Sequence, residues 1–66
     1  MIVFNGKEGA QIRMTVSGVG EVAFDTIRTV YIHDGFFVVV HDADNVTLYA
    51  ANKVMEVELH GFDKVD

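Results

Sequence analysis

The clearest pattern of apolar and polar positions in this chain is a run of β-forming residues on each side of Asp34-Gly35. Asp-Gly between two such runs is a strong signal for a two-residue type I′ turn, because both central residues of that turn need positive φ. This turn places Ile32 opposite Phe37 in the neighbouring strand, and cross-strand partners share a face of the sheet. The sequence therefore predicts a β-hairpin over residues 29–40.

Both faces of the predicted hairpin are apolar, whereas a hairpin with one face in water alternates apolar and polar residues. The first face carries Val30, Ile32, Phe37 and Val39, and the second carries Thr29, Tyr31, His33, Phe36, Val38 and Val40. A four-residue loop from Asp42 to Asn45 would add Leu48 to the first face and Tyr49 to the second. We expect the first face, with Leu48, to form the core, and the second face to be covered by something else.

Alternation with a period of two predicts further strands on both sides of the hairpin. Residues 10–17 alternate without a fault, and residues 1–4 form a short strand before them, joined by a glycine-containing loop at 5–9. A turn at 18–20, a strand after it, a strand near 46–49, one helical turn near 50–53 and a last strand at 54–60 complete the pattern. The predicted fold is all-β, a single domain spanning 1–66: an antiparallel meander of six or seven short strands that forms a small barrel or a rolled two-layer sheet.

The size and composition of the chain indicate how the second face is covered. A domain of 66 residues without cysteine cannot use disulfides, so its stability comes from an unusually apolar core or from oligomerisation. Half of the residues are hydrophobic, which excludes disorder. Closure of the sheet into a barrel would bury the first face and leave the second outside. We therefore predict a protein interface made of Tyr31, Phe36, Val38, Val40 and Tyr49, although covering by the chain's own strands remains the alternative.

The charge of the chain is unevenly distributed. The formal net charge is −5, and the whole excess lies in residues 34–66, which hold seven acidic and two basic residues. The predicted acidic surface comprises Asp42, Asp44, Glu56 and Glu58. An acidic chain repels phosphate backbones, so nucleic acid is not an expected partner, whereas a basic protein surface is a conceivable one. No apolar run approaches the roughly 18 residues of a membrane span, and no leader pattern is visible, so we expect a cytoplasmic protein that does not bind membranes.

Sequence motifs for catalysis, metals and cofactors are weak. Asp42-Ala-Asp44 opens like a calcium loop but lacks the later ligands, and Gly18-x-Gly20 is followed by strand alternation instead of the helix that a dinucleotide needs. Ser17 has no nucleophile-elbow context. His33 and His41 fall on opposite hairpin faces, which leaves His60 beside Glu56 and Glu58 as the one conceivable metal cluster. We expect no enzyme activity and no cofactor.

The sequence thus predicts a non-catalytic, small, acidic β protein that acts by protein–protein association, first with itself as a homo-oligomer. Two alternatives stay open. One is an acidic accessory inhibitor, of the kind used in phage counter-defence, that docks on a nucleic-acid-handling enzyme. The other is a structural component of a larger assembly, joined through an edge strand.

Overall fold

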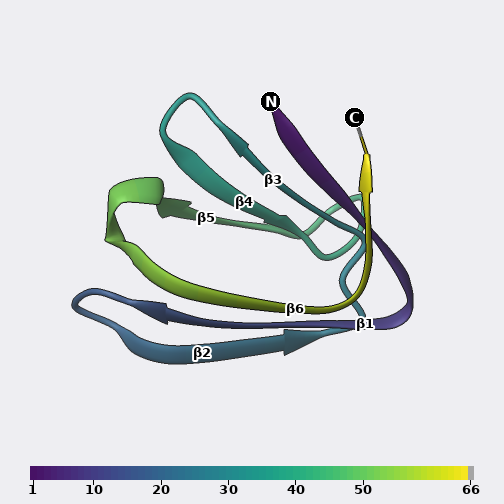
Figure 1. Ribbon diagram of the computed structural model, residues 1–66, viewed down its shortest axis with the longest axis horizontal. Coiled ribbons are helices and arrows are strands. Elements are labelled where there is room, and N and C mark those ends of the chain that lie inside the picture. Colours follow the sequence, from purple (N-terminus) through teal and green to yellow (C-terminus); the bar gives the residue numbers. More distant parts are fainter. Residues whose placement is uncertain (66) are drawn as a thin grey trace.

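The protein is a single curled antiparallel β-sheet, seen in a computed structural model that describes residues 1–65 (Figure 1). The all-β prediction is confirmed, with six strands and one short 3-10 turn, η1. The elements are β1 (Ile2–Val16), β2 (Gly20–Asp25), β3 (Thr29–His33), β4 (Phe36–Val40), β5 (Val46–Ala50), η1 (Ala51–Lys53) and β6 (Val54–Val65). The helical turn near 50–53 is therefore confirmed as η1.

The long strand β1 organises the sheet. Its second half pairs with β2 and its first half with β3, while β6 pairs with both halves along the opposite edge. The chain runs as a meander from β3 through β4 to β5, and η1 then returns it to β1 as β6. The result is a half-barrel with two layers (Figure 1). The lower layer contains β2, the second half of β1 and the first half of β6, and the upper layer contains β3, β4, β5, the first half of β1 and the second half of β6.

The two layers are joined by a sharp bend in β1. The prediction of a separate short strand and a loop at 5–9 is wrong, because this segment continues β1 through an irregularity between Gly6 and Gln11. The Gly6 N–H donates to the Arg28 carbonyl oxygen at 2.7 Å, and a Cβ at Gly6 would overlap the Ile27 carbonyl oxygen. The bend thus needs a residue without a side chain where the backbone between β2 and β3 crosses β1.

The predicted β3–β4 hairpin is confirmed residue for residue, from His33 opposite Phe36 to Thr29 opposite Val40. Both turn residues have positive φ, 50° at Asp34 and 78° at Gly35, as a type I′ turn requires.

The predicted register of the next hairpin is wrong by one residue. Val38 lies opposite Leu48 and Phe37 opposite Tyr49, so five residues, not four, separate the paired ends of β4 and β5. A one-residue slip exchanges the two faces of a strand. Tyr49 therefore packs against the core, and Leu48 lies outside at 57% exposure.

The core lies between the two layers. Its buried members are Ile12, Met14, Ile27, Val30, Phe37 and Val39. The strict alternation of residues 10–17 is confirmed, because Ala10, Ile12, Met14 and Val16 are all buried. Ile32, a predicted core residue, lies on the inner face but is 43% exposed, because it lines an apolar cavity at the open end of the half-barrel.

Candidate interaction surface

An apolar row crosses the outer face of the upper layer. Cross-strand pairing places one residue from each of five strands side by side: Val65 of β6, Val3 of β1, Tyr31 of β3, Val38 of β4 and Leu48 of β5. Directly opposed residues share a face of a sheet, so the row is continuous. We call this row, together with its apolar neighbours Phe36, Val40 and Val46, the outer face.

Side chains at the margins of the outer face are exposed to solvent, whereas the side chain at its centre is buried. Leu48 and Val46 at the β5 end are 57% and 53% exposed, and Phe36 is 47% exposed. Val38 is only 5% exposed, because Tyr31 and Leu48 lie directly beside it across the two neighbouring strands. Within residues 1–65 no second layer packs over this face. A group of large apolar side chains on an exposed sheet face is typical of an interaction site.

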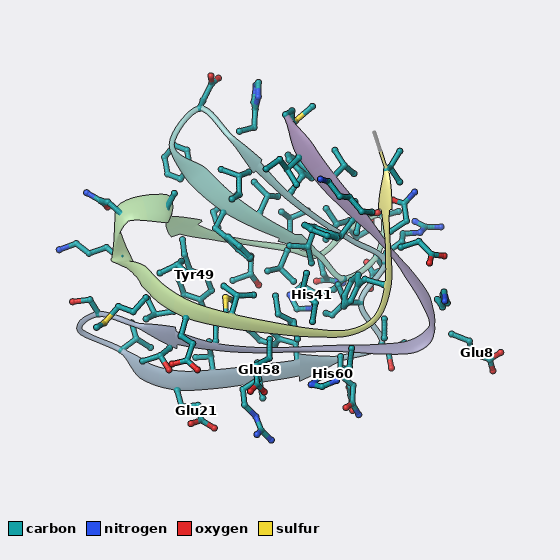
Figure 2. The ribbon with its side chains drawn as sticks, viewed as in Figure 1. Glu8, Glu21, His41, Tyr49, Glu58 and His60 are labelled. Atoms are coloured by element: carbon teal, nitrogen blue, oxygen red, sulfur yellow. The ribbon has the colours of Figure 1, made fainter. Side chains whose placement is uncertain are left out.

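Four of the five predicted interface residues, Tyr31, Phe36, Val38 and Val40, lie on this face. The placement of Tyr49 with them is wrong for the register reason given above: Figure 2 shows Tyr49 between the two layers. The residues that sequence reasoning missed are Val3, Val46, Leu48 and Val65. A predicted loop of five residues between β4 and β5 would have placed Val46 and Leu48 on this face. Val3 and Val65, in contrast, join the row only through pairings between distant segments.

The outer face of the lower layer is polar by comparison. Glu56 and Glu58 share it, as their spacing along β6 predicts, and Glu58 lies opposite Arg13. Glu21, Glu58 and His60 point away from the core on this side (Figure 2). A salt bridge of 3.7 Å joins Arg13 and Glu21. This surface therefore mixes both signs of charge.

The other predicted acidic residues, Asp42 and Asp44, lie in the loop between β4 and β5. Asp42 accepts hydrogen bonds from the Asn45 side chain at 2.9 Å and from the Asp44 backbone N–H at 2.8 Å. The Asn45 side-chain bond and then the Asp44 backbone bond hold the pKa of the Asp42 carboxyl below its ordinary value, because both stabilise its charged form. The four predicted acidic residues thus come from two different elements.

The histidines lie apart from one another. His33 is beside Asp34, with 3.2 Å between Nε2 and Oδ2, and His60 lies 3.8 Å from a Glu58 oxygen. His41 lies on the inner side, where its ring packs edge-on against Phe24 and its Nε2 is 2.8 Å from the Thr47 hydroxyl. The prediction that His33 and His41 occupy opposite faces is confirmed. Among residues 1–65, no three His, Asp or Glu side chains converge as a metal site would require.

An apolar cavity of about 290 Å³ opens at the end of the half-barrel where the first half of β1 and β3 face β6. Its lining includes Phe4, Ile32, Phe37 and Leu59. The cavity lies at the lower end of the size range of small-molecule sites, and such sites also carry a few convergent polar groups. Here the lining is apolar throughout, apart from the Tyr31 hydroxyl on the outer face.

Comparison with known proteins identifies no relative: no family model, no curated protein and no solved structure matches the chain. In the part of the chain that the structure describes, no helix has the length and apolar character needed to cross a membrane.

Proposed function

We propose that this protein is a non-catalytic β protein that acts by association with itself through the outer face of its upper layer. The observation that carries the proposal is the apolar row that runs across five strands with no covering layer among residues 1–65. Its exposed margin contains Phe36, Val46 and Leu48, and aromatic and aliphatic residues of this kind form the centres of stable protein interfaces. A second copy supplies the same apolar surface, so two outer faces can bury each other.

Phe36→Lys is the test of this proposal. Phe36 is 47% exposed, so a lysine there leaves the core intact but places a charge in the buried interface. Val38 is a poorer choice despite its central position, since at 5% exposure a lysine would disturb the folded subunit itself. The matched control is Met55→Lys, which makes the same charge change at a 72% exposed apolar residue of β6, outside the outer face.

Sedimentation equilibrium over a wide concentration range gives the result. We expect an oligomeric wild type, an unchanged Met55→Lys variant and a Phe36→Lys variant that dissociates at least tenfold more readily while it keeps the same circular dichroism spectrum. If both variants dissociate equally, the outer face is not the interface between copies.

The same measurement distinguishes self-association from the two alternative functions, both of which predict a monomer, and the salt dependence of partner binding then distinguishes these two from each other. An acidic inhibitor would be a monomer at every concentration and would bind a basic protein with an affinity that falls as salt rises. A component of a larger assembly would stay monomeric until its partner is added.

A further inference from the structure

The edges of the sheet differ sharply in charge. Three strands pair on one side only: β2 and β6, each with β1, and β5 with β4. β2 carries Glu21 and Asp25, and β6 carries four charged residues. β5 reads Val-Thr-Leu-Tyr-Ala, without charge or proline. Charged side chains on edge strands prevent pairing with other chains, so β5 is the one edge of the described sheet that lacks this protection.

The backbone groups on the free side of β5 can be assigned from the ladder. The Ala51 N–H donates to the Gly35 carbonyl oxygen at 2.8 Å, and hydrogen-bonded pairs alternate with non-bonded pairs in an antiparallel ladder. Thr47 and Tyr49 therefore bond to β4. The N–H and C=O groups of Val46 and Leu48 and the N–H of Ala50 point away from β4, toward the free edge. The Ala50 carbonyl oxygen, at the N-cap of η1, accepts the first hydrogen bond of that turn. No strand among residues 1–65 pairs with that edge.

We propose that β5 pairs antiparallel with β5 of a second copy, about a two-fold axis at Leu48. This proposal rests on the self-association proposed above and specifies a second contact for it. With the axis at Leu48, the two Leu48 residues face each other and Val46 faces Ala50 of the other copy. The outward N–H groups of Val46, Leu48 and Ala50 then donate to carbonyl oxygens of the other copy, with the Ala50 oxygen accepting through its second lone pair, as in other complexes formed by strand addition.

The segments that flank β5 carry opposite charges, which favours a second copy over an unrelated strand. Asp42 and Asp44 are exposed in the loop just before β5, and Lys53 is exposed in η1 just after it. An antiparallel two-fold pairing brings the acidic end of each copy beside the basic end of the other. Because of the symmetry, this complementary arrangement occurs twice in each dimer.

The pairing also extends the outer face. Val46 and Leu48 have their side chains on that face, so the rows of the two copies would join into one apolar surface across both subunits. Edge pairing and face packing are then two separate contacts, and together they build an even-numbered oligomer. Each contact can be removed without the other.

Ala50→Pro removes the edge contact selectively. Ala50 has φ of −60°, which suits proline, and its N–H points away from β4, so the substitution breaks no hydrogen bond within the subunit. Ala50→Val is the matched control, because it enlarges the same side chain but keeps the N–H. We expect Ala50→Pro to weaken dimerisation at least tenfold and Ala50→Val to leave it within about twofold.

A charge exchange tests the orientation. Lys53→Glu and Asp44→Lys should each weaken the dimer, because each places like charges at both ends of the paired strands. The double variant Asp44→Lys with Lys53→Glu restores opposite charges and should recover the wild-type affinity. Amide hydrogen exchange provides a further measurement: protection at Val46, Leu48 and Ala50 should rise with protein concentration, while protection at Glu21 of β2 should not.

The outcomes separate the two proposals. If the wild type is an oligomer that Phe36→Lys weakens, but Ala50→Pro and the charge variants behave as wild type, the edge contact is overturned and the face contact stands. If the proline and charge variants act as expected and Phe36→Lys does not, the edge contact stands alone. A wild type that is monomeric at every concentration overturns both.

Discussion

Replacement of Gly6 by alanine is expected to be the most damaging single-methyl change in this chain. Gly6 lies in the bend of β1, where an added Cβ would overlap the Ile27 carbonyl oxygen and lie 3.0 Å from the Ala10 Cβ. Neither obstacle is the end of a flexible side chain, since one is backbone and the other is the Cβ of a fully buried residue. The backbone of β1 must therefore move away from the segment between β2 and β3.

The cost has two parts. Forcing extra atoms into a packed site costs about 1–3 kcal/mol. The movement also strains two backbone hydrogen bonds across the bend, from Gly6 N to Arg28 O and from Ile27 N to Ala10 O, each worth about 0.5–1.5 kcal/mol net. The sum is about 2–6 kcal/mol, a large part of the roughly 3–10 kcal/mol that a chain of this length has available.

Urea and thermal unfolding, followed by circular dichroism at one fixed protein concentration, measure the effect. For a domain of this size each kcal/mol lowers Tm by about 4–8 °C, so Gly6→Ala should lower it by at least about 8 °C. The control is Gly9→Ala in the same bend. Gly9 has φ of 74° and no atom near an added Cβ, so its substitution should cost only the roughly 1–2 kcal/mol of a left-handed alanine.

The ranking of the two variants decides whether the close approach at Gly6 holds the bend. If Gly6→Ala is no more destabilising than Gly9→Ala, the crossing of β1 by the segment between β2 and β3 is looser than the structure indicates, and the explanation of the bend is wrong.

Two further predictions concern the β4–β5 hairpin. Phe37→Ala should cost about 3–5 kcal/mol and largely unfold the domain, whereas Leu48→Ala, at 57% exposure, should lower the stability of the subunit by less than about 1 kcal/mol; a cost for Leu48→Ala as large as that for Phe37→Ala in urea unfolding would restore the register predicted from the sequence, which buries both. Asp42→Ala should lower Tm at neutral pH, because the folded-state pKa of Asp42 lies below its ordinary value of 3.8. That difference should shrink as the pH falls through the folded-state pKa, so a Tm difference that grows in acid would refute the role of the Asn45 hydrogen bond.

The sequence by itself determined the features that depend on neighbouring residues. The β3–β4 register follows from Asp34-Gly35, because only the left-handed conformations of these two residues close a two-residue turn. The buried side of residues 10–16 follows from strict alternation, since a strand in contact with a core on one face must bury every second residue. The sequence also revealed the second apolar face of the β3–β4 hairpin, because the register fixes which residues share each face.

Tertiary structure decided the features that depend on distant segments. The loop after β4 accommodates either register locally, and the observed one places the His41 ring against Phe24 of β2 in the other layer. The glycines at 5–9 suggest a loop when considered alone. They form a bend within one strand only because β3 and β6 pair with β1 around it. Val3 and Val65 likewise complete the outer face through pairings that bring the two ends of the sequence together, and a local pattern contains no information about such pairings.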